Sequence, residues 1–430
     1  MKVAIIAIGD ELLLGQVTDT NSGSIARMID PAGWSVQSVK VIHDDADEIT
    51  KAVDEAFAVA DIVLTTGGLG PTKDDITKLT LCKYFGGELR KDDSVLDNIK
   101  EVFAKRGIKL NALTEAQAMV PTSCQVIQNR VGTAPIMWFD RQDGKVLVSM
   151  PGVPFETVQM FESAVFPQLL ERFASDEAIS HRCVIVEGLT ESKVAMQLEE
   201  WEDALPRYIH LAYLPKPGII RLRLDGHHHD AGILNTALDL LHGELCTRFA
   251  DHLLADADLT PEESLIQRLR AKGYTVASAE SCTGGNIAHR ITAIAGCSDV
   301  YRGSVVSYAN DVKENILGVN GVTIEAHGVV SEEVVAQMAD GACRALGTDC
   351  AIATSGIAGP SGATPERVTS AGIIPAKPVG TVCMAIAYPD AEHHGSRIVK
   401  TYTYHFPGTR DRVIDRASTT ALTLLAMALK

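Results

Sequence analysis

The sequence predicts an α/β protein in which two three-layer α/β domains are joined by a small α+β module. The chain has 430 residues, and single hydrophobic cores stop growing at roughly 250–300 residues. Short apolar runs alternate with amphipathic stretches over residues 1–173 and again over residues 260–430. This alternation is typical of sheets covered by helices on both faces. Residues 176–256 lack it and are predicted to form the joining module.

The order of apolar runs in the first domain predicts a parallel sheet covered on both faces. Strands are expected at residues 3–8, 36–42, 62–64 and 145–149. Helices are expected at residues 24–29, 49–59 and 155–173.

The middle module is predicted to hold strands at residues 183–186 and 219–224 and helices at residues 191–201 and 231–254, before a linker at residues 256–261. Strands of the last domain are expected at residues 275–279, 304–307, 350–354, 381–387 and 398–404. Its helices are expected at residues 262–271, 287–295, 331–346 and 410–429, with Ser331 as the N-cap of the third.

Composition excludes several classes of protein. The net charge is −16, so nucleic acid and anionic membrane are not expected partners. No apolar run approaches the roughly 18 residues that span a bilayer. The nine cysteines are scattered and include no C-x-x-C pair, which argues against a disulfide framework and a structural zinc site. We expect a cytoplasmic protein.

A glycine-rich turn, TTGGLGPTKDD at residues 65–75, follows a predicted buried strand and precedes a helix. Gly67, Gly68 and Gly70 allow close approach of a ligand to the backbone, and a helix N-terminus favours an anion such as phosphate. Asp74 and Asp75 supply oxygen ligands for a hard divalent metal. The alternative is a plain turn whose aspartates complement the helix dipole.

The segment AESCTGG at residues 279–285 also lies between a predicted strand and a helix. Chemistry alone allows either Ser281 or Cys282 as a nucleophile, but no feature nominates the histidine that a cysteine usually needs. A serine can instead be activated by a desolvated lysine. SYANDVK offers Tyr308 and Lys313 after the next strand. The alternative is a solvated Lys313 and a core Tyr308.

Five segments in the last domain resemble the carboxyl-terminal domain of the CinA family, which includes PncC-type deamidases of nicotinamide mononucleotide (NMN). They are AESCTGG, SYANDVK, SGIAGP, KPVGTV and PGTRDRV. The resemblance implies hydrolysis of NMN to nicotinate mononucleotide and ammonia without a metal or other cofactor. It implies that Ser281 attacks the amide, that Lys313 is the general base and that Tyr308 belongs to the proton-transfer network. The implied substrate-binding residues are Cys282, Thr283, Gly284, Gly285, Ser355, Gly356 and, for the phosphate, Arg410.

Four segments of the first domain resemble the molybdopterin-binding-like domain of the same family. They are IAIGDELLLGQVTDTN, the glycine-rich turn, NRVGTAP and SMPGVPFE. In that family the domain is associated with hydrolysis of ADP-ribose to AMP and ribose 5-phosphate, with a divalent metal ion as cofactor. The resemblance implies a phosphate cradle at Gly67, Gly68, Gly70 and Thr72. The acidic residues it implies for the metal are Asp75, Asp74 and Asp44.

The sequence departs from the family pattern in three places. Ile136 follows GTAP where relatives commonly carry glycine, and Ile414 stands where many relatives carry a second arginine. Residues 363–376 form an insertion before KPVGTV, which is either a lid or a longer surface loop. The middle module resembles the KH-like insert of full-length CinA proteins but lacks the GXXG loop that clamps nucleic acid. The histidines of residues 227–230 are predicted to form a solvated polar turn.

The sequence thus predicts a bifunctional enzyme of pyridine-nucleotide recycling, with NMN and ADP-ribose as its small-molecule substrates. A homodimer is implied by the resemblance. The alternative is a non-enzymatic protein that binds molybdopterin or a nucleotide and acts in competence or the DNA-damage response.

Overall fold

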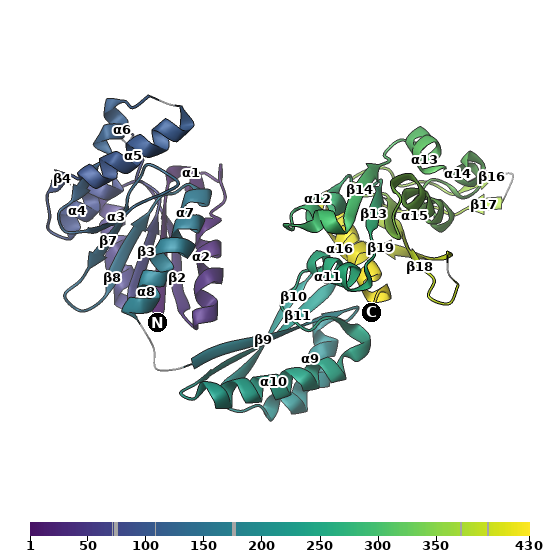
Figure 1. Cartoon of the computed structure of the whole chain (residues 1–430), viewed down its shortest axis with the longest axis horizontal. Coiled ribbons are helices and arrows are strands. Elements are labelled where there is room, and N and C mark those ends of the chain that lie inside the picture. The colour runs from purple at the N-terminus through teal and green to yellow at the C-terminus, as the bar shows by residue number, and fades with distance from the viewer. Residues whose placement is uncertain (71, 73–75, 108, 174–177, 370–371, 394) are drawn as a thin grey trace. The chain divides into compact units, whose positions relative to one another are not determined.

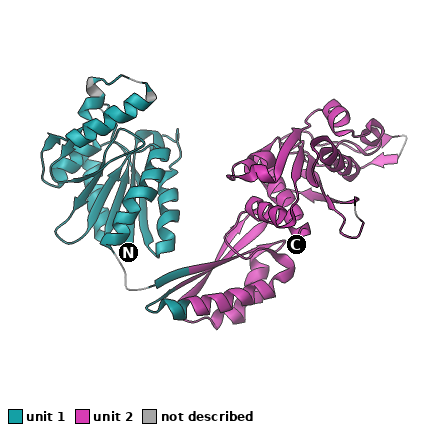
Figure 2. Cartoon of the chain, viewed as in Figure 1, with its two compact units in different colours: residues 1–180, 227–234 teal, residues 181–226, 235–430 magenta. Residues whose placement is uncertain are grey.

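The computed structural model describes residues 1–430 except 71, 73–75, 108, 174–177, 370–371 and 394. The chain divides into two compact units (Figure 2). The first comprises Met1–Ser180 and His227–Leu234, and the second comprises His181–Gly226 and Asn235–Lys430. Among the described residues, no helix is both long and apolar enough to cross a membrane.

The first unit contains a six-stranded sheet in the order β2-β1-β3-β8-β7-β6. Its strands are β1 (Lys2–Ile8), β2 (Ser35–Ile42), β3 (Ile62–Thr66), β6 (Gln125–Ile127), β7 (Ile136–Asp140) and β8 (Val146–Met150). The four predicted strands are confirmed and run parallel, but β7 and β6 add an antiparallel edge. Only a short turn separates β7 from β8, and so short a connection joins antiparallel neighbours. The sheet is therefore mixed, not wholly parallel.

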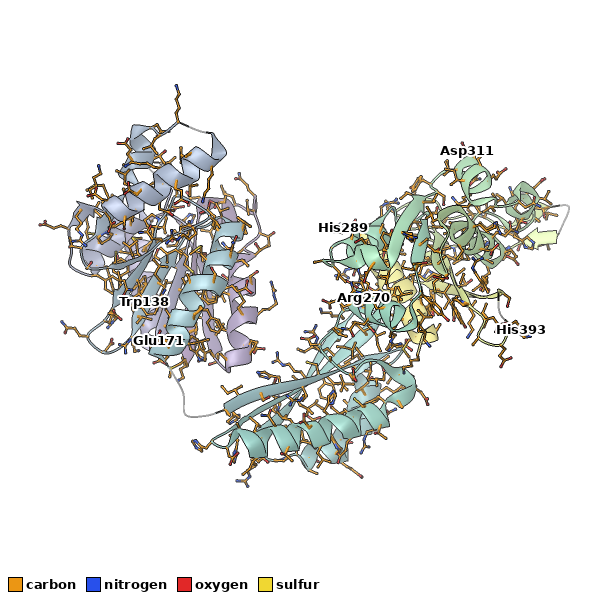
Figure 3. All side chains as sticks on the ribbon, in the orientation of Figure 1. Trp138, Glu171, Arg270, His289, Asp311 and His393 are labelled. Atoms are coloured by element: carbon orange, nitrogen blue, oxygen red, sulfur yellow. The ribbon has the colours of Figure 1, made fainter. Side chains whose placement is uncertain are left out.

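Helices cover both faces of this sheet (Figure 1), and each face has its own apolar core. Side chains fill the space between the layers (Figure 3). The helices are α1 (Asp10–Leu13), α2 (Asn21–Ile29), α3 (Ala46–Val59), α4 (Thr77–Tyr84), α5 (Asp93–Arg106), α6 (Ala112–Ala116), α7 (Pro154–Met160) and α8 (Phe166–Arg172). A small hairpin pairs β4 (Leu89–Lys91) with β5 (Met119–Pro121).

The predicted closing helix is interrupted by one π-helical turn, Phe161–Val165, between α7 and α8. There the backbone N–H of Phe166 donates to the carbonyl of Phe161, five residues earlier. Pro167 lacks an N–H and cannot make the ordinary bond one turn back, which accounts for the changed pattern.

The middle part of the chain forms a four-stranded sheet in the order β10-β11-β9-β12. Its elements are β9 (Ala178–Glu187), α9 (Glu191–Asp203), β10 (Ile209–Lys216), β11 (Ile219–His228), α10 (Ala231–Arg248) and β12 (Leu253–Ala255). The prediction missed β10 and β12 and extended α10 too far. β10 is an edge strand that contains Pro215. Proline has no backbone N–H to donate to a neighbouring strand, so its presence in a sequence argues against a strand.

The last part forms a five-stranded sheet in the order β14-β13-β15-β18-β19. All five predicted strands are confirmed, as β13 (Val276–Glu280), β14 (Tyr301–Val306), β15 (Cys350–Gly356), β18 (Thr381–Pro389) and β19 (Arg397–His405). β13, β14 and β15 are parallel, and β18 and β19 are antiparallel. The helices are α11 (Pro261–Lys272), α12 (Asn286–Thr292), α13 (Asn310–Leu317), α14 (Gly321–His327), α15 (Glu332–Leu346) and α16 (Arg410–Ala428). The prediction missed α13 and α14.

The middle sheet and the last sheet share one apolar core. Ile185 of β9, Ile219 of β11 and Leu254 of β12 belong to the same buried cluster as Leu265 of α11 and Ala421 of α16. Across the predicted linker, Arg221 pairs with Asp258 at 2.7 Å. The middle sheet is thus packed directly against the helices of the last domain.

Of residues 227–230, predicted to form a solvated polar turn, His227 and His228 are instead the last residues of β11, and only His229 and Asp230 lie between β11 and α10. Asp230 accepts the backbone N–H groups of Gly232 and Ile233 at the start of α10, and its own N–H donates to Nδ1 of His228. All nine cysteines, each a described residue, carry free thiols.

Candidate active site

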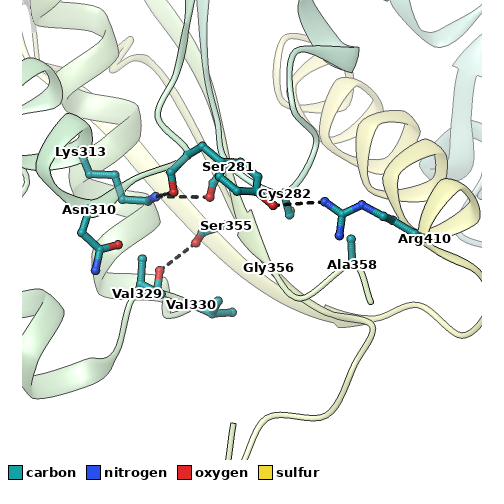
Figure 4. Close-up of a pocket in the computed structure, with 11 residues that line it drawn as sticks. Ser281, Cys282, Asn310, Lys313, Val329, Val330, Ser355, Gly356, Ala358 and Arg410 are labelled. Atoms are coloured by element: carbon teal, nitrogen blue, oxygen red, sulfur yellow. Dashed lines mark hydrogen bonds between the residues drawn. The ribbon is translucent and has the colours of Figure 1, made fainter. Parts of the chain in front are cut away.

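A pocket of about 190 Å³ opens at the carboxyl ends of β13 and β15 (Figure 4). Parallel strands bring their carboxyl ends to one edge of a sheet, where ligand sites of α/β folds form. The pocket is lined by Ser281, Cys282, Tyr308, Asn310, Lys313, Val329, Val330, Ser355, Gly356, Ala358 and Arg410. It therefore gathers the three predicted catalytic residues and four of the seven substrate-binding residues predicted for this domain.

The turn that presents Ser281 is organised by a buried carboxylate, Glu280, which the sequence analysis did not single out. Its Oε2 accepts N–H groups of Gly285 and Ile287, and its Oε1 accepts that of Ala288. Thr283 donates its hydroxyl to the same carboxylate at 2.7 Å. Glu280 thus satisfies the first amides of α12, which would otherwise lack partners. The only sequence signal was an acid directly before the serine.

Lys313 is fully buried and lies within reach of the serine. Its Nζ is 3.3 Å from Oγ of Ser281, 2.5 Å from the carbonyl oxygen of Ser307 and 3.3 Å from that of Tyr308. Burial lowers the pKa of the Lys313 amine because the charged form loses its hydration. The alternative of a solvated Lys313 is wrong.

Cys282 differs from Ser281 in its electrostatic surroundings. Its side chain is buried, and burial raises the pKa of the thiol to about 12. A thiol with such a pKa holds almost no thiolate near neutral pH, and the thiolate is the nucleophilic form. Geometry and ionisation therefore favour Ser281 over Cys282, which the sequence left open.

Tyr308 and Arg410 form one wall of the pocket. The Tyr308 side chain is exposed, so the alternative of a core aromatic is wrong. A guanidinium nitrogen of Arg410 donates to the Tyr308 hydroxyl at 3.2 Å, and another donates to the carbonyl of Gly359 at 2.8 Å. Arg410 is the first residue of α16.

Ser355 and Gly356 lie at the end of β15 and line the pocket. The Ser355 hydroxyl donates to the carbonyl of Val329 at 2.8 Å and so holds the 328–330 loop against the strand. Asn310, one helical turn before Lys313, was missed as a lining residue although it lies inside SYANDVK. No local signal marked Val329 and Val330.

Thr283, Gly284 and Gly285 do not line the pocket. The Thr283 hydroxyl is buried between Glu280 and Thr354. Gly284 and Gly285 have φ values of 62° and 98°, which a residue with a side chain rarely adopts. In the structure these three residues build the turn beneath Ser281. Ile414 is partly buried against the apolar core.

Within residues 363–376, β16 (Arg367–Thr369) pairs antiparallel with β17 (Gly372–Ile374), and we call this strand pair the hairpin. At its base, Thr364 and Lys377 exchange two backbone hydrogen bonds of 3.0 and 2.9 Å. Arg367 donates to the carbonyl of Glu325, and the Lys377 amine donates to those of His327 and Val330. The insertion is therefore docked on the segment around α14.

In the first unit, the four segments that carry the family resemblance converge. A Cβ on Gly67 would lie 2.0 Å from the carbonyl oxygen of Ile8, and Gly67 has φ 100°. Asn21 donates to the carbonyl of Gly152 at 2.8 Å. Asn129 donates to Glu156 at 2.8 Å. Gly67 is thus required by packing against β1.

Asp44 lies at the glycine-rich turn. A Cβ on Gly68 would be 3.1 Å from its carboxylate, and that carboxylate accepts the N–H of Asp10 at 3.2 Å. Nδ1 of His43 is hydrogen-bonded to the carboxylate of Asp10 at 2.7 Å, and this bond raises the pKa of the imidazole. Gly70 and Thr72 lie in the same loop, and Thr72 is exposed.

Asp74 and Asp75 lie outside the described residues. Among the residues that are described, no three His, Cys, Asp or Glu side chains form a group that could hold a metal ion. The described side chains at this turn therefore do not by themselves constitute a metal site. Ile136 is fully buried in the core with Val3 and Ile5, so its side chain occupies the core of the sheet.

Comparison with known proteins places the chain in a family. Residues 258–429 match the CinA C-terminal domain, and residues 4–171 match the probable molybdopterin binding domain. The chain is 42% identical to a CinA-like protein of Cytophaga hutchinsonii over 89% of each chain. It is 38% identical to one of Flavobacterium psychrophilum, over 99% of this chain and 98% of the relative.

Among solved structures, the protein CinA with unknown function from Thermoplasma acidophilum is similar at 35% identity and a TM-score of 0.36. The match covers 39% of this chain and 96% of that one. Because two relatives of more than 30% identity match over most of their length and both domains match family models, the chain belongs to the CinA family.

Proposed function

We propose that the last domain hydrolyses the carboxamide of NMN to nicotinate mononucleotide and ammonia. One observation carries the proposal: a fully buried lysine amine lies 3.3 Å from a serine hydroxyl in a pocket that also contains an arginine. This is the arrangement that a serine–lysine amidase requires.

Lys313 acts as the general base. A neutral amine has two N–H donors, and two backbone carbonyls, of Ser307 and Tyr308, accept from it. Its lone pair is then left for the proton of Ser281. Ser281 Oγ attacks the amide carbon as its proton moves to Lys313, and the same proton passes to the leaving nitrogen when the C–N bond breaks.

The resulting acyl-enzyme is hydrolysed by water. Lys313 takes a proton from the water and returns it to Ser281, so the serine is regenerated and the acid is released. Each proton taken by Lys313 is given back within the cycle. The described residues supply the base, the nucleophile and the pocket.

Arg410 binds the phosphate of the nucleotide. Its planar donor fork suits phosphate oxygens, and it begins a helix of 19 residues. Thr409, the N-cap of that helix, makes no side-chain hydrogen bond to its first turn. Backbone amides at a helix N-terminus favour an anion.

The test is ammonia release from NMN by the full-length protein with EDTA present. Ser281→Ala should remove the activity, whereas Cys282→Ala, a change at the neighbouring pocket residue, should retain most of it. Loss of activity in Cys282→Ala alone would contradict the assignment of Ser281. If the folded protein releases no ammonia, the proposed amidase activity is wrong, and the alternative of a non-enzymatic binding protein replaces it.

The second proposal is that the first unit hydrolyses ADP-ribose to AMP and ribose 5-phosphate with a divalent metal. It is supported by the position of Asp44 against the glycine-rich turn. AMP should form from ADP-ribose with Mg²⁺ or Mn²⁺ and not with EDTA. Asp44→Asn should lower this rate, and Asp47→Asn, an exposed neighbour in α3, should not. Tight pterin binding without turnover would contradict the proposal.

A further inference from the structure

A second cavity, of about 380 Å³, lies beside the active-site pocket. Asn310, Val329 and Val330 line both. The second cavity is completed by Ile324, Gly328, Thr364, Pro365, Glu366, Arg367, Ile374 and Lys377. The two cavities therefore adjoin at these three residues, and the inserted hairpin builds the far side of the second.

This cavity has a largely apolar wall. Ile324, Val329, Val330 and Ile374 contribute aliphatic side chains. The two cations that line it, Lys377 and Arg367, donate to backbone carbonyls of the 325–330 segment. An apolar cavity of roughly 150 Å³ is sufficient for benzene, so this space can hold a group of that size.

The proposed reaction assigns the leaving group to the side of Ser281 on which this cavity lies. In Figure 4, Arg410 and Asn310 lie on opposite sides of Ser281, and Lys313 is on the Asn310 side. In the proposed reaction Lys313 gives its proton to the leaving nitrogen, so that nitrogen must lie on the Lys313 side. Asn310, three residues before Lys313, also lines the second cavity.

We propose that this protein accepts secondary amides, in which the leaving amine carries an apolar substituent, and that the second cavity holds this substituent. The proposal rests on the serine–lysine amidase described above and extends its substrate class. Ile374 on the hairpin and Ile324 on α14 set the size of the substituent.

The chemistry balances without a further reactant. Ser281 Oγ forms an ester with the acyl carbon as the C–N bond breaks, and the amine leaves with the proton that Lys313 carried. Water then hydrolyses the ester, so one amide and one water give one carboxylic acid and one amine.

The probe is the N-benzyl amide of NMN, compared with NMN itself, using the full-length protein. Benzylamine and ammonia are measured separately. The kcat/KM for the N-benzyl amide should lie within about tenfold of that for NMN. A larger deficit with NMN turnover intact would overturn this inference alone. Failure to hydrolyse either compound would instead remove the proposed amidase.

Matched tryptophan substitutions locate the substituent. Ile374 is 8% exposed, whereas its neighbour Ile373 is 65% exposed and does not line the cavity. Ile374→Trp should lower kcat/KM for the N-benzyl amide by about tenfold or more and leave that for NMN within about twofold. Ile373→Trp should change neither.

Ile324→Trp fills the cavity from α14 and should reproduce the effect of Ile374→Trp. Because Ile324 lies on α14 and not on the hairpin, agreement between the two variants excludes misfolding of the hairpin as the cause. If both substitutions lower the two activities equally, the cavity does not discriminate between the amides and the inference is wrong.

Discussion

Lys313 owes its proposed role to its surroundings. In the middle of a polar segment its side chain is nevertheless fully buried, and burial lowers the pKa of the amine. A base must be unprotonated to act, so a lower pKa increases the fraction of active enzyme near neutral pH. The pKa of Cys282, which lines the same pocket, shifts in the opposite direction because burial raises the pKa of a thiol.

We predict that amidase activity rises with pH through one ionisation below the usual lysine value of about 10.4. Lys313→Arg should lose activity by about 10²–10⁴-fold, because arginine stays protonated, and the residual activity should lack this ionisation. The measurement is the pH profile of kcat/KM for NMN. Lys272→Arg, an exposed site, is the control. An unchanged profile in Lys313→Arg would remove the residue from the role of base.

We predict that Glu280→Gln destabilises the turn that carries Ser281. The glutamine amide places donors against backbone N–H groups that now donate to a carboxylate. The cost in free energy of unfolding should be about 2–4 kcal/mol. Amide hydrogen exchange at residues 285–288 should quicken and ammonia release should fall. Glu314→Gln, at an exposed site, should do neither, and unchanged exchange in Glu280→Gln would refute the argument.

At the scale of elements, local signals in the sequence correspond closely to helix and strand ends. Ser331 caps α15 as predicted, with its hydroxyl accepting the N–H of Val334 and donating to the carbonyl of Gly328. Thr260 and Glu263 form a complete capping box on α11. These bonds link residues within three positions of one another, which is why a sequence pattern predicts them.

We predict that Ser331→Ala lowers the free energy of unfolding by about 1 kcal/mol. The loss follows from the unpaired N–H of Val334 and from the freed carbonyl of Gly328. Urea unfolding monitored for the second unit is the measurement. Ser331→Asn, which keeps an acceptor for the helix N-terminus, should recover most of the loss. Equal destabilisation by both substitutions would indicate that packing, not capping, accounts for the effect.

At the scale of the whole molecule, most of the middle sheet and the last sheet belong to one compact unit. Their shared core extends from β9 to α16. Arg268 of α11 donates to the carbonyls of Leu254 in β12 and Ala426 in α16. One side chain thus ties the middle sheet to two helices of the last domain.

We predict that Arg268→Met lowers the free energy of unfolding of the second unit by about 1–3 kcal/mol, because two carbonyls lose their donor. Arg270→Met, two residues along the same helix, should cost less than about 1 kcal/mol, since Arg270 pairs with Asp299 and donates to the carbonyl of Gly296 at the exposed surface, where water replaces both bonds. Denaturant unfolding of the full-length protein measures both. Similar losses in the two variants would contradict a joining role for Arg268.

The sequence by itself determined the two α/β sheets, the positions of their predicted strands along the chain, the Ser331 cap, and the segments that meet at the active-site pocket and at the glycine-rich turn. These depend on apolar periodicity and on contacts between near neighbours. Tertiary structure alone decided the antiparallel edges, the docking of the hairpin at residues 363–376 and the core shared between the two sheets of the second unit. It also decided that Lys313 and Cys282 are buried and that Thr283 supports the turn beneath Ser281. Burial and its effect on pKa arise from side chains far apart in the chain, so no local pattern could reveal them.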